Sequence, residues 1–376
     1  MTKPKFSSPL PGSLHALKAV FMSAAVLLAL TACGGGGGGS STTAASVADA
    51  AAIAASTTLA ASAVESPPVP TLVASSYATG SEERDAFNLL NFERSSCGFG
   101  TLTQSLQLDA AARAHADYQI LNSVVSHTET SGRAGFTGAT PADRVAAQGY
   151  AGAGGVTDEI VALVGTDSKT ALGASGVRGL LSAPYHLRGL VGGFREMGVS
   201  IRSSTDLGRT TPTVVLQIDA AYKTSAGPQF LGSTDINTYP CQGTTGINRQ
   251  LTNETPNPIP GRDLALRPLG AVVYVSVREG NNLEINATSM TEVSTGRAIT
   301  LRSPVGDRAR PASATSIATT KDPYAPCLEG CFKSHQAYIA ADAPVLANTD
   351  YRMQISGTNN GVTFTRSFVF RTGSGG

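Results

Sequence analysis

The first 76 residues contain one short apolar segment and then a long run of small residues, which restricts folded structure to the residues that follow. From residue 34 to residue 76 the sequence is almost entirely Gly, Ala, Ser, Thr and Val, with prolines near its end. Such a segment buries too little apolar surface to offset the entropy lost on folding. We therefore expect residues 33–76 to form a low-complexity tether with a root-mean-square span of about 35–40 Å.

The segment before the tether has the composition of a secretory signal. Lys3, Lys5 and Lys18 precede an apolar run over residues 19–30, and no acidic residue comes before that run. A positive region followed by a short apolar region is typical of signal peptides. The sequence therefore predicts that residues 1–32 direct export across the inner membrane and are removed.

The apolar run ends in Leu-Thr-Ala-Cys at residues 30–33, which resembles the lipobox of bacterial lipoproteins. That resemblance implies diacylglycerol on the sulfur of Cys33, so that the membrane is a partner through a lipid anchor. Gly34, rather than Asp, follows the Cys, and by resemblance to Gram-negative lipoproteins this favours the outer membrane, on its periplasmic or surface face. The alternative is an ordinary signal peptide with a coincidental cysteine.

Charge and hydropathy restrict the remaining function classes. The chain of 376 residues has 28 basic and 27 acidic residues, and this balance excludes a globally basic nucleic-acid-binding protein. After the signal segment no apolar run reaches the ~18–20 residues needed to cross a bilayer. We therefore expect no nucleic-acid partner and no membrane-spanning helix.

Helical patterns come first in residues 77–242, and strand patterns follow. Helices are expected over residues 82–94, from Asp109 as N-cap to about residue 120, from Thr140 as N-cap to Gly149, and over residues 168–181. Strands are expected over residues 196–202 and 213–220. Helices followed by strands, without βαβ alternation, predict an α+β domain.

Residues 265–376 carry short β-rich segments separated by Gly and Pro. Alternating apolar residues flank Asn359-Asn360-Gly361, and an Asn-Gly turn between such runs is the strongest short-range hairpin signal. This pattern predicts an all-β domain, and its last part resembles bacterial immunoglobulin-like sandwiches. Residues 243–264 include several prolines and are expected to link the two domains.

Histidine is scarce, with five residues, so the position of each is informative. His127 and His186 each follow a predicted helix, where irregular backbone can aim a side chain into a cleft. His115 falls in the middle of a predicted helix, where a packed or solvated side chain is expected. Two acids, Glu159 and Glu196, lie next to apolar runs and complete the set of candidate site residues.

Several short motifs between residues 82 and 222 occur in a characteristic order. They are Leu-Asn-Phe-Glu-Arg at 90–94, Leu-Asp-Ala-Ala-Ala-Arg-Ala-His-Ala at 108–116, Ser-His at 126–127, an acid near residue 159, Pro-Tyr-His at 184–186 and Glu-Met-Gly-Val at 196–199. In this order they resemble the CAP superfamily of cysteine-rich secretory, antigen-5 and pathogenesis-related (SCP-like) proteins. The resemblance implies an α–β–α sandwich.

In that family two His and two Glu line one cleft, and the resemblance implies that four residues do so here: His127, Glu159, His186 and Glu196. Neutral imidazoles are good ligands for Zn²⁺, and carboxylates that accept the other ring N–H orient them. We therefore expect a loosely held divalent metal such as Zn on His127 and His186, with open coordination positions. Two alternatives stay open: a hydrogen-bonded network that only joins the layers, and Asp158 instead of Glu159 as the first acid.

The export signal with its lipobox-like end and the CAP resemblance together predict a cell-envelope binding protein whose cleft takes a small or lipid-like ligand. The alternatives are a hydrolase or peptidase acting on peptide or cell-wall material, and a structural or adhesive surface module. No Gly-x-Ser-x-Gly or His-Glu-x-x-His motif is present, and Ser126 is a neighbour of His127 on the chain, where two side chains seldom face each other. We therefore assign no catalytic residue.

An exported chain meets an oxidising compartment, so its cysteines are expected to pair. Cys97 follows the first predicted helix and Cys241 follows the last predicted strand of the first domain, so a bridge between them would join the two ends of that domain. Cys327 and Cys331 are expected to form a local disulfide. The alternative is a metal site that adds His335, four residues further on.

Overall fold

The computed structural model describes residue 71, residues 73–325 and residues 331–375. The signal segment, most of the tether, Cys33 and Cys327 lie outside the described residues, so the predictions about them stay predictions. Among the residues that the structure describes, no helix is both long enough and apolar enough to cross a membrane.

A four-stranded sheet forms the middle layer of the first domain. Its strand order is β1-β3-β4-β2, so β2 lies at one edge. β4 pairs antiparallel with both β2 and β3, whereas β1 pairs parallel with β3. The strands are β1 (Thr103–Gln104), β2 (Ala153–Val164), β3 (Glu196–Ser203) and β4 (Thr213–Lys223).

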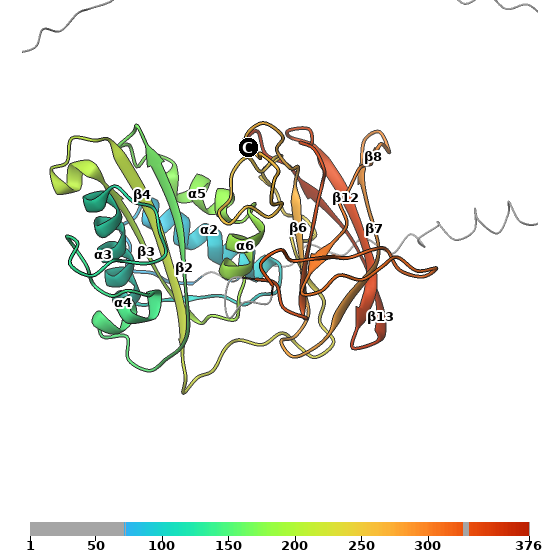
Figure 1. Ribbon diagram of the computed structural model, residues 1–376, viewed down its shortest axis with the longest axis horizontal. Coiled ribbons are helices and arrows are strands. Elements are labelled where there is room, and N and C mark those ends of the chain that lie inside the picture. Colours follow the sequence, from blue (N-terminus) through green and yellow to red (C-terminus); the bar gives the residue numbers. More distant parts are fainter. Residues whose placement is uncertain (1–70, 72, 326–330, 376) are drawn as a thin grey trace, which may run out of the picture. The chain divides into compact units, whose positions relative to one another are not determined.

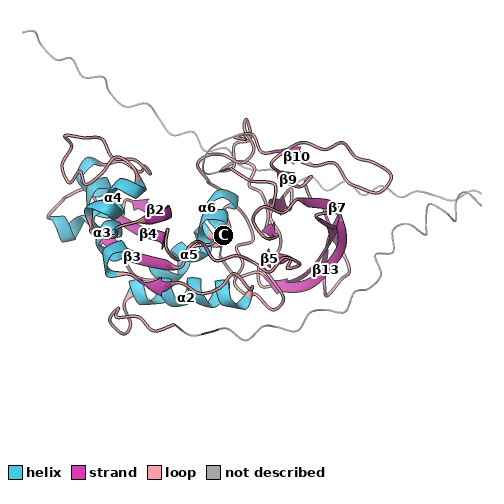
Figure 2. Ribbon diagram, turned by 90° about the horizontal axis from the view of Figure 1, so that it is seen from below, coloured by secondary structure: helices cyan, strands magenta, loops and turns pink. Residues whose placement is uncertain are grey.

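Helices cover both faces of this sheet (Figure 1). On one face lie α3 (Leu106–Asn122) and α4 (Pro141–Ala147); on the other lie α2 (Glu82–Ser96), α5 (Leu172–Leu180) and α6 (Pro184–Leu190). Figure 2 shows the same three layers from below. A short 3-10 helix, η1 (Ser204–Leu207), connects β3 to β4. The predicted α–β–α sandwich is confirmed.

Two helix starts can be compared with their predicted caps. Thr140 is the N-cap of α4, as predicted, and closes a reciprocal capping box. Asp109 is not the N-cap of α3, because the helix already begins after Ser105, whose side chain caps it. Asp109 lies in the first turn, where its carboxylate accepts the Val199 amide of β3 at 2.9 Å. Asp109 therefore fixes α3 to the sheet.

The two elements that carry Glu159 and His186 are not predicted by the sequence. β2 covers 12 residues, but Thr157-Asp158-Glu159 at its centre interrupts the apolar pattern of a strand. α6 has seven residues, too few for a helical period to stand out. Both elements matter for the site, because β2 carries Glu159 and α6 carries His186.

The C-terminal part, which consists of the described residues from 237 onward, forms two sheets packed as a β-sandwich (Figure 1). One sheet has the order β10-β9-β11-β6-β5, and the other has the order β13-β12-β7-β8. The strands are β5 (Asn237–Tyr239), β6 (Val272–Ser276), β7 (Leu283–Glu292), β8 (Ala298–Ile299), β9 (Val305–Gly306), β10 (Thr320–Lys321), β11 (Gln336–Ala340), β12 (Asp350–Asn359) and β13 (Val362–Arg371). The predicted hairpin joins β12 to β13, with Asn360 and Gly361 at positive φ in its turn.

One continuous apolar core joins the two parts of the chain. The buried residues that pack α2 against β3 continue through Tyr239 and Val273 to Phe368 in β13. β5 lies before residue 242 yet pairs with β6, so the C-terminal sheet takes in a segment that precedes the predicted linker.

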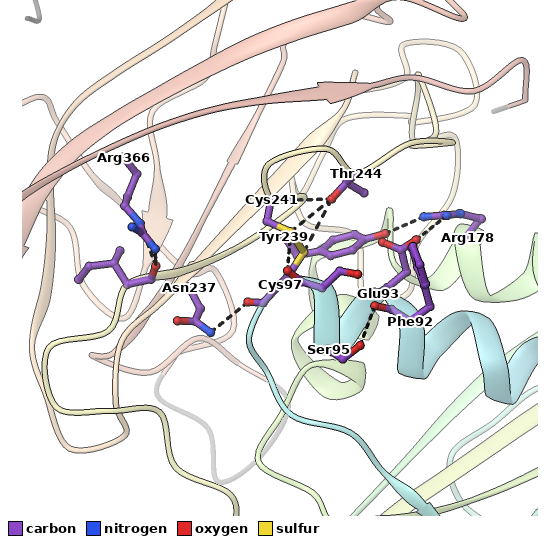
Figure 3. Close-up of a disulfide and its surroundings, with 12 residues drawn as sticks. Phe92, Glu93, Ser95, Cys97, Arg178, Asn237, Tyr239, Cys241, Thr244 and Arg366 are labelled. Carbon is purple, nitrogen blue, oxygen red and sulfur yellow. Dashed lines mark hydrogen bonds and ion pairs between the residues drawn. A yellow bond between two sulfur atoms is a disulfide. The ribbon is translucent and has the colours of Figure 1, made fainter. Parts of the chain in front are cut away.

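The predicted disulfide between Cys97 and Cys241 is confirmed (Figure 3). The two Cα atoms are 5.5 Å apart, and the bridge joins the end of α2 to the residues after β5. Beside it, Arg178 pairs with Glu93 at 2.5 Å and donates to the Tyr239 hydroxyl at 3.1 Å. Cys331 is also disulfide-bonded, while its pairing with Cys327 stays a prediction.

Candidate functional site

Two neighbouring acids of the edge strand β2 organise the site. Asp158 and Glu159 are both buried, at 5% and 4% exposed. Successive side chains of a strand point to opposite faces of the sheet. Asp158 therefore reaches the layer of α3 and α4, and Glu159 reaches the layer of α6.

Asp158 orients His127, which lies in the loop after α3. The Nδ1 atom of His127 is 2.9 Å from Asp158 Oδ1. This hydrogen bond raises the pKa of His127 above its ordinary value, because the carboxylate stabilises the imidazolium. The His127 side chain is 48% exposed, so a solute can reach it.

Glu159 orients His186 in the first turn of α6. The Nδ1 atom of His186 is 2.6 Å from Glu159 Oε2, and the side chain is 16% exposed. Burial lowers the pKa of His186, but the hydrogen bond to Glu159 and the charge of that carboxylate outweigh burial and raise the pKa. Each imidazole is therefore held at its Nδ1 atom by a carboxylate of its own.

The two rings lie close together with their other nitrogens available. Their centroids are 6.2 Å apart, and the ring planes are tilted by 40°. Because each Nδ1–H donates to a carboxylate, the neutral ring keeps its lone pair on Nε2. Within the described ranges, neither Nε2 has a hydrogen-bond partner. Two neighbouring imidazoles therefore each keep an Nε2 lone pair that is available for a ligand.

Arg144 of α4 holds the Asp158 carboxylate in place. Its Nη2 donates to Asp158 Oδ2 at 2.7 Å, and its Nη1 donates to the His127 carbonyl oxygen at 3.0 Å. Burial raises the pKa of Asp158, but His127 and Arg144 outweigh burial and hold that pKa below its ordinary value. Asp158 is therefore an anion. No sequence motif distinguishes Arg144 from an exposed helix arginine, so its role is not predictable from the sequence.

His115 is packed, as expected, and does not belong to the pair formed by His127 and His186. It is fully buried in α3. Its Nδ1 lies 2.8 Å from Glu129 Oε1, and its Nε2 lies 2.7 Å from the Ser126 carbonyl oxygen. Both ring nitrogens face oxygen atoms inside the protein, so neither is open to a ligand.

A glycine lets Glu159 approach α6. A Cβ on Gly189 would overlap the Oε1 atom of Glu159. The same oxygen accepts the Thr157 hydroxyl at 3.0 Å, which leaves Oε2 for His186. The absence of a side chain at Gly189 is therefore a condition for the Glu159–His186 contact.

The resemblance implies that Glu196 lines the same cleft, but its carboxylate bonds to Tyr150 and not to the histidines. It stands at the start of β3, where its Oε2 accepts the Tyr150 hydroxyl at 2.5 Å. No hydrogen bond or ion pair joins Glu196 to either imidazole in the described part of the chain. Of the two acids left open for the first position, the structure brings Asp158 to His127 and Glu159 to His186.

The donor set fits a loosely held metal and not a closed structural site. The described ranges contain no group of three or more His, Cys, Asp or Glu side chains arranged to hold a metal ion. Two imidazoles on one tetrahedral Zn²⁺, with Zn–N near 2.0–2.1 Å, would have centroids about 5 Å apart. A small movement of the half-exposed His127 ring would bring the observed 6.2 Å to this value. His127 and His186 would then supply two ligands and leave the others open.

Comparison with known proteins gives a family match for one part of the chain. Residues 87–218 match the family model described as the cysteine-rich secretory protein family, CAP. A solved extracellular protein containing a SCP domain, from Bacillus anthracis str. Ames, is 19% identical over 38% of this chain and 40% of its own. Its TM-score of 0.29 is too low to carry a structural argument, and no curated protein matches the chain. Residues 87–218 of this chain form a CAP domain.

Proposed function

We propose that this CAP domain binds a divalent metal ion such as Zn²⁺, through Nε2 of His127 and Nε2 of His186. One observation carries the proposal: separate carboxylates hold the Nδ1 atoms of two neighbouring imidazoles and leave both Nε2 atoms without a partner in the described ranges. Such carboxylate–histidine pairs fix the tautomer and orientation that metal ligands need.

With two protein ligands, the ion would be exchangeable and would keep open positions for a further ligand. A bound metal would supply a Lewis-acidic centre for an oxygen or nitrogen atom of that ligand. We propose a small or lipid-like molecule as the ligand, on the strength of the family resemblance. The half-exposed His127 gives it access, whereas the more buried His186 forms the inner side of the site.

A hydrolase with Ser126 as nucleophile receives no support from the geometry. The Ser126 hydroxyl lies 3.1 Å from the Thr128 hydroxyl and accepts the Thr128 amide at 3.0 Å. A serine nucleophile needs a base within hydrogen-bond reach, and neither contact is to an imidazole. We therefore propose binding rather than catalysis.

We further propose that the protein works outside the cytoplasm, anchored in the outer membrane by a lipid on Cys33. The proposal rests on the signal-like segment and on the resemblance to the lipobox. Cys33→Ser should move the protein from the detergent phase to the aqueous phase in a phase-partitioning assay. Unchanged partitioning of that variant would end the anchor proposal and leave the metal proposal intact.

Calorimetric Zn²⁺ titration of the purified protein tests the metal proposal. The wild type should bind one Zn²⁺, and each of His127→Ala and His186→Ala should lose most of that affinity. His335→Ala is the matched control, because His335 lies in the C-terminal part and should leave Zn²⁺ binding unchanged. A folded His127→Ala His186→Ala variant that binds Zn²⁺ like the wild type would show that the two histidines have only a structural role.

A further inference from the structure

The helix that carries His186 is capped from outside the CAP domain. α6 has no side-chain cap of its own, since its N-cap is Ala183. Glu254 takes that place: its Oε1 accepts the Tyr185 amide at 2.6 Å and the His186 amide at 3.4 Å. Glu254 is 5% exposed, and it follows His186 by 68 residues, beyond the family match that ends at residue 218.

A second anchor reaches the same helix from the C-terminal sandwich. The Tyr185 hydroxyl donates to Asp322 Oδ1 at 2.9 Å. Asp322 has no exposed surface, and its carboxylate also accepts the amides of Tyr324 at 3.0 Å and Phe332 at 2.8 Å. Because three donors fix this carboxylate, it is a rigid point of attachment for α6.

The Tyr185 ring packs into the same part of the sandwich. Its centroid is 5.7 Å from that of Phe332 and 5.6 Å from that of Tyr324. The neighbouring residue on the helix, His186, instead points to β2 and contacts Glu159. α6 is thus held between the C-terminal part through Tyr185 and the CAP sheet through His186.

Among the described residues, His127 has no such attachment to the C-terminal part. The contacts that orient it come from Asp158 in β2 and from Arg144 in α4, both inside the CAP domain. The two imidazoles of one candidate site are therefore positioned by different parts of the chain.

We propose that Glu254 and Asp322 are positioning residues for His186, so that the C-terminal part completes the site of the CAP domain. The inference rests on the proposed function only in taking His186 as a site residue. It assigns the C-terminal part a role that a separate adhesive module would not have.

The test uses the full chain without metal, and compares the wild type with Glu254→Ala and Glu254→Gln. In Glu254→Ala the Tyr185 and His186 amides should exchange hydrogen at least ~10-fold faster, because a buried acceptor is lost. The ¹⁵N resonances of the His186 ring should shift at fixed pH, while those of His127 stay in place. Glu254→Gln keeps an acceptor oxygen and should restore both signals.

Glu292→Ala is the matched control, because Glu292 is also a buried C-terminal glutamate but bonds to Ser294 and Arg297. It should leave both imidazoles unchanged. Tyr185→Phe keeps the aromatic ring and removes the hydrogen bond to Asp322. It should therefore shift the ¹⁵N resonances of His186 and leave those of His127 in place. This variant replaces Glu254→Ala if Glu254→Ala does not fold. Unchanged His186 signals in a folded Glu254→Ala variant, or equal shifts of both rings, would overturn the proposal.

A Zn²⁺ titration of the same variants separates this inference from the proposed function. If the wild type binds Zn²⁺, Glu254→Ala should weaken binding on the order of 10-fold, as expected for a residue that orients a ligand. Glu254→Gln should bind close to wild type. If the wild type binds no Zn²⁺, the proposed function fails, and the exchange and ¹⁵N comparison still decides the role of Glu254.

Discussion

Asp158 and Glu159 are neighbours in β2, but they orient two different histidines from opposite faces of the sheet. Asp158 contacts His127 at 2.9 Å, and Glu159 contacts His186 at 2.6 Å. The alternation of a strand turns two adjacent acids into two separate supports. Because β2 is an edge strand, the two rings can meet beside it, with their centroids 6.2 Å apart.

Because each histidine is held by a different carboxylate, we expect the pKa values of His127 and His186 to respond to different substitutions. Asp158→Asn should lower the pKa of His127 and change that of His186 much less, because the hydrogen bond to Asp158 is the main cause of the raised His127 pKa. Glu159→Gln should lower the pKa of His186 in preference to that of His127, because the carboxylate is what outweighs burial there. NMR titration of both rings measures this. A variant that moves both pKa values equally would contradict independent positioning.

The close approach of Glu159 to α6 predicts that a side chain at residue 189 destabilises the protein. Gly189→Ala places a Cβ against Glu159 Oε1, and overpacking of this kind costs about 1–3 kcal/mol of unfolding free energy. The control is Gly179→Ala in α5, where a Cβ meets nothing within 4 Å. This variant should raise the free energy of unfolding by up to about 1 kcal/mol, because Ala favours the helix more than Gly does. Urea unfolding compares the two, and equal stability of both variants would argue against a close approach at Gly189.

Arg144 should be among the most costly side chains to remove. Arg144→Met leaves the buried Asp158 carboxylate without its 2.7 Å partner, a loss of about 3–5 kcal/mol for a buried pair. Arg371→Met is the control, because its 3.1 Å pair with Asp350 is about half exposed and should cost less than about 1 kcal/mol. Denaturant unfolding gives both values. A similar small loss in both variants would refute the account of Asp158 as a buried, supported anion.

Asp219 should make the stability fall as the pH rises. Burial, followed by the nearby Asp158 charge, raises the pKa of Asp219 to about 7, so the folded chain holds this proton more tightly than the unfolded chain. The resulting stabilisation is complete below the ordinary Asp pKa and is lost as the pH rises through about 7. Asp219→Asn keeps the oxygen that Gln217 contacts but cannot titrate. The wild type should therefore lose a few kcal/mol relative to Asp219→Asn between about pH 4 and about pH 8; parallel stability curves would contradict this.

Local signals explain which parts of the fold the sequence predicts. The Thr140 cap and the Asn360-Gly361 turn depend on residues a few positions apart, and both are confirmed. β2 escapes prediction because its polar centre is buried by partners that are distant in sequence. Arg144 contacts Asp158 across 14 residues, and α6 contacts Glu159 across 27.

The site was predictable only as far as the family resemblance reaches. The resemblance brings together His127, Glu159 and His186, and the structure places all three in one constellation. It does not decide between Asp158 and Glu159 as the first acid, and the structure uses both, because neighbours in a strand point to opposite faces of the sheet. Contacts from outside the family region, such as that of Glu254, have no local signal at all.

The most direct test of the central claim is a Zn²⁺ titration followed by the ¹⁵N resonances of the two imidazoles, above both of their pKa values. Before metal is added, His127 and His186 should both show the tautomer with the proton on Nδ1, because each Nδ1 faces a carboxylate. With added Zn²⁺, both Nε2 resonances should shift together and saturate at one equivalent. A proton on Nε2 in the free protein, or a shift of only one ring, would contradict a metal site shared by the two histidines.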